Sequence, residues 1–205
     1  MIPRYWQRAS RELANLDPVL SRLAEAHAGV SIASRGDPFT TLFRSIVGQQ
    51  ISVKAAESVW ARVREALPAP TPRAVLECPA ERLRGCGLSA RKVEYIVDLA
   101  GHFAGGRIHA RRWPRMSDAE IIAELTAVRG IGVWTAEMFL IFNLLRPDVF
   151  PVDDIGLQKA VARHYFAGKR PSRSELALVG EAWRPWRTVA TWYLWRSLDP
   201  VPVEY

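Results

Sequence analysis

The chain of 205 residues contains only two cysteines, Cys78 and Cys86. Two thiols cannot build a disulfide framework, a four-cysteine zinc site or a four-cysteine iron–sulfur cluster. We therefore expect no iron–sulfur cofactor. We interpret both cysteines as small, half-buried residues.

Long apolar segments are also absent. The longest one, from Val133 to Leu145, is interrupted by Glu137 and Asn143. Neither this segment nor the amino terminus has the apolar run of a membrane span or a signal peptide. We therefore expect an intracellular protein with no membrane partner, located in the cytoplasm and, in a bacterium, associated with the nucleoid.

No segment shows the sustained alternation of a β-strand. Apolar residues recur instead with helical spacing. Two such segments contain Phe39, Leu42, Phe43, Ile46 and Val47, and Ile121, Ile122, Leu125 and Val128. Turn-forming residues separate the segments, and none of these breaks is long enough to be a domain linker. The pattern predicts an all-α protein of about ten short helices.

Lysine is scarce, since only four of the 28 basic residues are lysines. The net charge is nevertheless +7, with an isoelectric point near 9.9. Such a charge favours a polyanionic partner, because phosphate contacts release condensed counterions. The arginines suit bidentate phosphate contacts, and genome composition explains their excess equally well.

Gly130 and Gly132 separate two predicted helices, over residues 118–128 and 133–145. Glycines allow the backbone angles and the close approach that a bulkier side chain blocks. The N-terminus of the second helix presents unpaired N–H groups and a partial positive charge. A phosphate is the natural ligand of such a turn, and a plain helix–helix connection is the alternative.

A second Gly-x-Gly turn, Gly85 to Gly87, precedes a helical segment that carries Arg91 and Lys92. A simple connection and a second DNA contact explain this turn equally well.

Asp153 and Asp154 precede another helical pattern, which begins at Ile155. Aspartate is a favoured N-cap, and it also offers a carboxylate for chemistry. The residues alone leave both roles open.

Several segments, in this order along the chain, resemble the helix-hairpin-helix DNA glycosylases and, among them, the 3-methyladenine DNA glycosylase II group. They are residues 46–56, 87–89 with Lys92, the hairpin, 151–154 and 186–195. The resemblance implies an all-α fold of two helical lobes, with the hairpin (about residues 118–145) at the rim of the cleft between them. The interior lobe would be residues 35–146, and the second lobe residues 1–34 plus 147–205.

The resemblance assigns the catalytic role to Asp154, beside the sugar of a nucleotide flipped out of the duplex. Flipping is required because a stacked base shields its glycosidic bond. Cleavage builds positive charge on the sugar, so a nearby carboxylate stabilises the transition state more than the ground state. The carboxylate can also orient or deprotonate the attacking water. Asp153 is then a cap or a support.

The residue at position 134 indicates the type of glycosylase. Bifunctional relatives carry a lysine at the matching place, because an amine must attack the sugar carbon. Here it is Trp134, so we expect no lyase step. The resemblance places Trp195 against the extruded base, with Trp134 and Met138 nearby; methionine departs from the aromatic residue of the best-known bacterial relatives.

The resemblance also predicts how DNA is held. Gln50 is the candidate wedge that enters the gap left by the flipped base. The other candidate DNA-binding residues are Gln49, Ser52, Gly130, Gly132 and Thr135. The backbone carbonyls of Thr126, Val128 and Ile131 are candidate ligands of a structural sodium or potassium ion.

None of the four histidines falls in a motif, so no acid is evident that would protonate the leaving group. The best substrate is then a base that already carries positive charge. We predict a monomeric, monofunctional DNA glycosylase that removes alkylated purines from duplex DNA in base excision repair. The alternatives are a non-catalytic DNA-binding module and a glycosylase for oxidised or deaminated bases.

Overall fold

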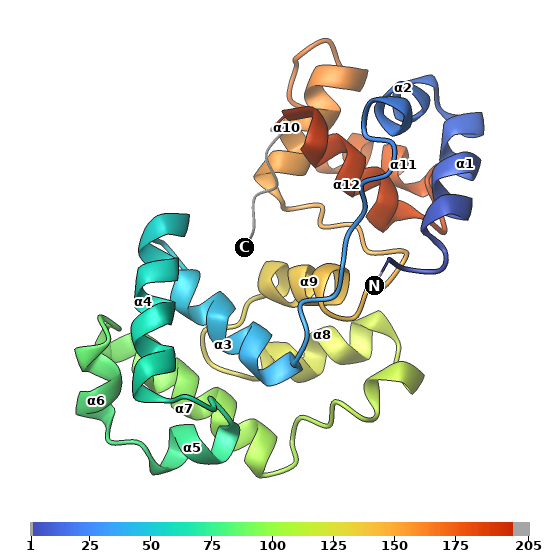
Figure 1. Cartoon of the computed structure of the whole chain (residues 1–205). Helices are drawn as coiled ribbons and strands as arrows, with labels where there is room; N and C mark the ends of the chain where they lie inside the picture. Colours follow the sequence, from blue (N-terminus) through green and yellow to red (C-terminus); the bar gives the residue numbers. More distant parts are fainter. Residues whose placement is uncertain (1, 199–205) are drawn as a thin grey trace. The chain divides into compact units, whose positions relative to one another are not determined.

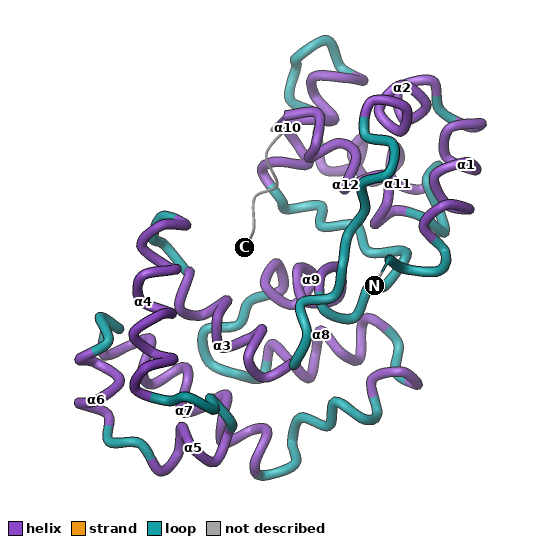
Figure 2. Tube along the Cα trace, viewed as in Figure 1, coloured by secondary structure: helices purple, strands orange, loops and turns teal. Residues whose placement is uncertain are grey.

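The computed structural model describes residues 2–198, and this part of the chain forms helices and no strand (Figures 1 and 2). It contains twelve α-helices and one 3-10 helix. The all-α prediction is confirmed, although the expected number of helices was too low. None of these helices combines the length and the apolar character that a bilayer crossing requires.

The described residues pack as two compact units: unit 1 contains residues 2–34 and 140–198, and unit 2 contains residues 35–139. Residues 140–146, which the resemblance assigned to the interior lobe, pack within unit 1. The hydroxyl of Ser34 donates to the carbonyl of Asn143 (3.0 Å), and the hydroxyl of Tyr5 donates to the carbonyl of Leu145 (2.8 Å). These two bonds hold the segment against the N-terminal part of the chain.

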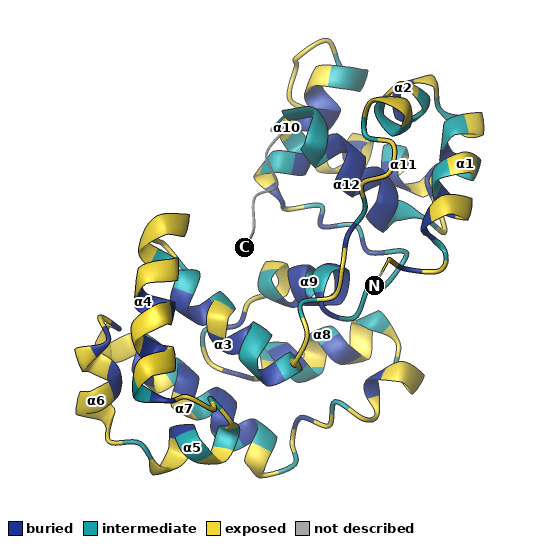
Figure 3. Ribbon diagram, viewed as in Figure 1, coloured by how far each residue is buried: buried dark blue, intermediate teal, exposed yellow. Residues whose placement is uncertain are grey.

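Unit 1 contains α1 (Trp6–Leu16), α2 (Pro18–Ala26), α10 (Ile155–Tyr165), α11 (Arg173–Glu181) and α12 (Arg187–Leu198). Helix α12 is its centre, since α1, α2 and α10 all pack against it. The seven consecutive residues from Thr188 to Leu194 are buried, which Figure 3 shows as an almost continuous dark ribbon.

Asp17 joins three helical segments of unit 1. One carboxylate oxygen caps α2 by accepting the backbone N–H groups of Val19 (2.8 Å) and Leu20 (3.1 Å). The other oxygen accepts the hydroxyl of Tyr165 (2.8 Å) and the indole N–H of Trp183 (3.2 Å). The buried ring of Trp183 and the half-buried ring of Tyr165 therefore find their polar partner in a helix cap.

Unit 2 contains the following elements, in chain order: α3 (Pro38–Gly48), α4 (Val53–Ala66), α5 (Pro72–Glu77), α6 (Ala80–Gly85), α7 (Ala90–Ala104), η1 (Trp113–Arg115), α8 (Asp118–Thr126) and most of α9 (Val133–Phe142). Helix α7 packs against α3, α5 and α6. Phe43 meets Trp60 edge to face, with ring centroids 5.3 Å apart, and Trp113 meets Phe139 in the same way at 5.2 Å. These aromatic pairs form the centre of its core.

The two helices of the hairpin are shorter than the sequence predicts. Helix α8 ends at Thr126, because the N–H of Val128 bonds to the carbonyl of Leu125, only three residues back (3.1 Å). Helix α9 ends at Phe142, and Leu145 then adopts a φ of 54°. Apolar residues continue beyond both helix ends, so the apolar pattern does not show where the helices end.

Two fully buried threonines of α12 differ in their hydrogen bonding. Thr188 donates to the carbonyl of Arg146 (2.6 Å) and accepts the N–H of Val149 (3.0 Å). Thr191 has no hydrogen-bond partner for its hydroxyl within the described part of the chain. The first hydroxyl anchors α12 to the segment before α10, and the second only costs desolvation free energy.

We expect Thr188→Val to lower the free energy of unfolding by about 2 kcal/mol, because it leaves a buried N–H and a buried carbonyl unpaired. The matched change Thr191→Val should raise it by up to about 1 kcal/mol, because it removes an unsatisfied buried hydroxyl. Urea denaturation measures both variants. Equal effects of the two changes would contradict the assigned anchor.

Candidate active site

Asp154 both caps a helix and holds a second donor. Its Oδ1 accepts the N–H of Leu157 (2.6 Å), which starts α10, and the indole N–H of Trp195 (2.8 Å) from α12. Only 9% of the residue is exposed. The capping role that the sequence left open is confirmed, and it positions a buried carboxylate between two directed donors.

Two further residues surround the pair. A Cβ on Gly156 would lie 3.1 Å from Oδ1 of Asp154 and 3.2 Å from Cδ1 of Trp195, so the absence of a side chain lets the indole approach. The ring of Phe142 stacks on Trp195 with centroids 5.9 Å apart and an angle of 18° between the planes. No sequence pattern indicates either residue, because the Trp195 ring that both contact lies far away along the chain.

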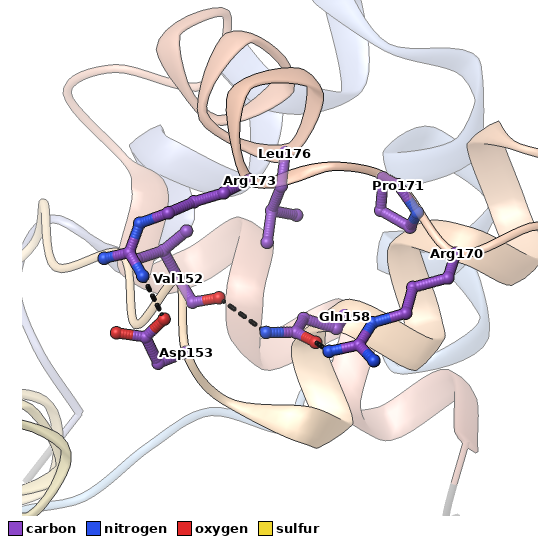
Figure 4. A pocket seen from close by; sticks show the side chains of 7 residues that line it. All are labelled: Val152, Asp153, Gln158, Arg170, Pro171, Arg173 and Leu176. Carbon is purple, nitrogen blue, oxygen red and sulfur yellow. Dashed lines mark hydrogen bonds and ion pairs between the residues drawn. The ribbon is translucent and has the colours of Figure 1, made fainter.

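Asp153 has a different environment. Its carboxylate forms an ion pair with Arg173 at the exposed start of α11, on one side of a pocket of about 210 Å³. Figure 4 shows this ion pair and, beside it, the amide of Gln158 donating to the carbonyl of Val152 (3.0 Å). Arg170 donates in turn to Gln158 (3.1 Å).

The lining of this pocket is Val152, Asp153, Gln158, Arg170, Pro171, Arg173 and Leu176. Asp154 is not among these residues, so the pocket does not contain the candidate catalytic group. Asp153 pairs with Arg173 and does not cap α10, because the cap is Asp154; a supporting role for Asp153 stays a prediction.

The hairpin of unit 2 depends on Gly130. Its φ is +84°, and a Cβ would overlap the ring of Tyr95 on α7. On one side the amide of Gln49 donates to the carbonyl of Gly130 (2.8 Å). On the other, the N–H of Arg129 donates to Asp98 (2.9 Å). Three side chains from outside the hairpin thus fix its backbone.

The residues that follow the turn start α9. The N–H of Ala136 bonds to the carbonyl of Gly132 (3.0 Å). Gly132 is exposed, Thr135 is half-buried and Trp134 is 37% exposed. Met138, one helical turn further on, is buried. The expected phosphate-binding turn is therefore open to solvent.

The turn between α3 and α4 carries the candidate wedge. Gln50 is exposed and has a φ of 58°, a left-handed conformation that is unfavourable for a residue with a side chain. Ser52 caps α4 by accepting the N–H of Ala55 (3.3 Å). Gln49, in contrast, already bonds to Gly130, so in this structure it ties the turn to the hairpin.

The second Gly-x-Gly turn leads into α7, which Ser89 caps. The ammonium of Lys92 donates to the carbonyl of Val47 (2.7 Å), and burial lowers the pKa of Lys92. Arg91 is exposed. Lys92 thus holds the end of α3, whereas Arg91 is open to a solvent-side partner.

Side-chain metal sites do not appear between residues 2 and 198: no three histidine, cysteine, aspartate or glutamate side chains come together. The candidate alkali-metal ligands are backbone carbonyls of the hairpin. The carbonyl of Val128 accepts the N–H of Ile131 (3.2 Å); a carbonyl oxygen has two lone pairs, so this bond still leaves one for a cation.

Known proteins share the region of the chain that contains the glycine hairpin and the buried aspartate. The family model of the HhH-GPD superfamily base excision DNA repair protein matches residues 43–185. The chain belongs to this superfamily. The matched HhH-GPD region includes both the hairpin and Asp154, and the recognition made from the sequence is confirmed.

Individual known proteins are similar to this chain over most of its length. DNA-3-methyladenine glycosylase 1 of Schizosaccharomyces pombe is 34% identical over 165 residues, which are 78% of this chain and 72% of that protein. The protein YfjP of Bacillus subtilis is 32% identical over 188 residues, and the matched part is 88% of this chain but only 66% of YfjP. The chain thus spans slightly less than two thirds of that relative.

Solved structures agree with the fold. A DNA-3-methyladenine glycosidase of Bacillus halodurans superposes with a TM-score of 0.85 at 35% identity, over 93% of this chain and 89% of that one. A 3-methyladenine DNA glycosylase of S. pombe in complex with abasic DNA superposes with a TM-score of 0.80 at 31% identity, over 97% and 98% of the two chains.

We expect Gly130→Ala to destabilise unit 2 by more than about 2 kcal/mol, because the new methyl group meets the Tyr95 ring and φ is positive. Gly132→Ala is the control, since a Cβ there meets no atom within 4 Å and should change the free energy of unfolding by less than about 0.5 kcal/mol. Thermal denaturation of both variants measures the difference. Equal melting temperatures would contradict the role of Gly130.

Proposed function

We propose that this chain is a monofunctional DNA glycosylase that removes alkylated purine bases from duplex DNA and leaves an abasic site. The observation that carries the proposal is the buried carboxylate of Asp154, with Oδ1 held by Leu157 and Trp195. A fixed carboxylate stabilises the positive charge that develops on the sugar, because it needs no reorganisation as the bond breaks.

Leu157 and Trp195 donate to Asp154 through a backbone amide and an indole, and neither of these groups can protonate a leaving base. A substrate that already carries positive charge, such as a purine alkylated at N3 or N7, leaves without such help. The names of the relatives, DNA-3-methyladenine glycosylase and glycosidase, support the same substrate class.

The first turn of α9 carries Trp134 where a lyase needs an amine. Its ring is 37% exposed and suits stacking on an extruded cationic base. Met138 would add a polarizable wall. The reaction would therefore end at the abasic site, without cleavage of the DNA backbone.

The hairpin would hold the DNA backbone through the N–H groups at Gly132 and Thr135, and Gln50 would fill the gap left by the flipped base. The S. pombe structure with abasic DNA supports a duplex partner. An alkali-metal ion on the carbonyls of Thr126, Val128 and Ile131 would add positive charge there. We propose that the protein acts in the cytoplasm as a monomer, without an iron–sulfur cluster.

Release of free base from methylated duplex DNA tests the proposal. The wild-type protein should liberate 3-methyladenine or 7-methylguanine, quantified by chromatography and mass spectrometry. Asp154→Asn keeps the size of the side chain and an oxygen acceptor but removes the charge, and it should release base at least about 100-fold more slowly.

Binding to a duplex with a tetrahydrofuran abasic analogue is the control for this experiment, because it needs the hairpin and not the chemistry. Asp154→Asn should bind this duplex as the wild type does. If neither protein releases base although both bind, the chain is a DNA-binding module. Borohydride trapping of a covalent adduct with the wild type would instead indicate a lyase.

We expect the substitution of Gln50 by glycine to change the free energy of unfolding and the rate of base release in opposite directions. We expect Gln50→Gly to raise the free energy of unfolding by about 1 kcal/mol, because glycine adopts a positive φ without strain. Its rate of base release should fall, because the wedge is gone. Gln50→Ala is the comparison, since it loses the wedge and keeps the strain. An active Gln50→Gly variant would rule out the wedge.

A further inference from the structure

We infer that Trp195 is a positioning residue: its indole N–H fixes the orientation of the Asp154 carboxylate, and Gly156 provides the space that this contact needs. The inference deepens the proposed function and rests on it. It differs from the stacking role that the resemblance gave to Trp195, because it assigns the effect to the N–H group and not to the ring face.

The two bonds to Oδ1 come from different helices. The N–H of Leu157 belongs to the first turn of α10 and would hold any capping aspartate. The indole N–H of Trp195 comes from α12 and arrives from a second direction, 2.8 Å away. A second donor from another direction restricts rotation of the carboxylate, and therefore the direction of its second oxygen.

Gly156 makes the second bond possible. A methyl group at this position would lie 3.1 Å from Oδ1 of Asp154, 3.2 Å from Cδ1 of Trp195 and 3.3 Å from Nε1 of Trp195. All three distances are closer than ordinary van der Waals contact. The indole or the carboxylate would have to move away from the methyl group. Such a shift would lengthen the hydrogen bond between Trp195 and Asp154.

Trp195 itself is held on two sides. Phe142 stacks on its ring, and the residue directly follows the buried run of α12 that ends at Leu194. At the other end of α10, His164 shares a hydrogen bond of 2.8 Å with the hydroxyl of Ser197. Helices α10 and α12 are thus joined near both ends of α10, so the donor cannot easily shift relative to the acceptor.

The two roles of Trp195 predict different kinetics. A stacking platform contributes to binding of the flipped base, so losing it changes binding most. A positioning residue acts on the chemical step, because misdirection of a catalytic group by about 1 Å can cost on the order of 100-fold in rate. In the positioning role, the N–H group of Trp195 affects the reaction only through its hydrogen bond to Asp154.

Trp195→Phe tests this distinction, because it keeps an aromatic ring against Phe142 and removes the donor. We expect the single-turnover rate of base release at saturating enzyme to fall on the order of 10- to 100-fold, with an unchanged half-saturating enzyme concentration on the methylated duplex. Trp192→Phe is the matched control: Trp192 lies on the same helix, packs against Trp6 and should keep the wild-type rate.

Gly156→Ala tests whether the hydrogen bond between Trp195 and Asp154 needs a residue without a side chain at position 156. The variant should fold normally, because alanine favours a helix more than glycine does, but its single-turnover rate should fall by a similar factor. Gly101→Ala is the control, since Gly101 lies in α7 and a Cβ there meets nothing within 4 Å. Circular dichroism melting curves show whether each variant is folded.

Wild-type rates for both Trp195→Phe and Gly156→Ala would overturn the inference, as would a weaker affinity for the methylated duplex with an unchanged rate. Failure of the proposed function itself looks different. In that case the wild type releases no base, or Asp154→Asn is as active as the wild type.

Discussion

The carboxylate of Asp154, held by two N–H donors, is the interaction on which the candidate active site depends. One donor lies in the first turn of α10, and the other comes from α12, so the carboxylate joins α10 to the helix at the centre of unit 1. Burial of a carboxylate costs free energy unless hydrogen bonds compensate for it. The same bonds that make its burial tolerable also give it a defined direction.

The candidate catalytic residue and the candidate DNA-binding hairpin lie in different units. Asp154 and Trp195 belong to unit 1, whereas Gly130 and Gln50 belong to unit 2. Each site is organised within its own unit: Tyr95, Asp98 and Gln49 fix the hairpin, as Leu157 and Trp195 fix the carboxylate. Preorganisation of this kind lowers the ordering cost at the moment of binding.

Much of the fold followed from local patterns in the sequence. Helical periodicity and capping residues indicated an all-α chain, and Asp154 stands at a helix start as its position before Ile155 suggested. The exact ends of α8 and α9 did not follow, because apolar residues continue past them. Local patterns do not record where a chain leaves a helix when the next residues are also apolar.

The supporting contacts of the site were not predictable from the sequence. Gly156 lies two residues from Asp154, yet its importance arises from Trp195, 39 residues further along the chain. Asp98 and Tyr95 fix the hairpin from α7, and Gln49 turned out to bond to Gly130. Such contacts depend on packing, which no spacing pattern encodes.

The central claim is that Asp154 stabilises positive charge on the sugar of a flipped nucleotide. Comparison of two abasic-site analogues in the same duplex tests it most directly: a cationic pyrrolidine, which mimics the charged transition state, and a neutral tetrahydrofuran. The wild type should bind the pyrrolidine duplex at least about 100-fold more tightly than the tetrahydrofuran duplex, and Asp154→Asn should lose this preference. Equal affinity of the wild type for the two duplexes would contradict the account.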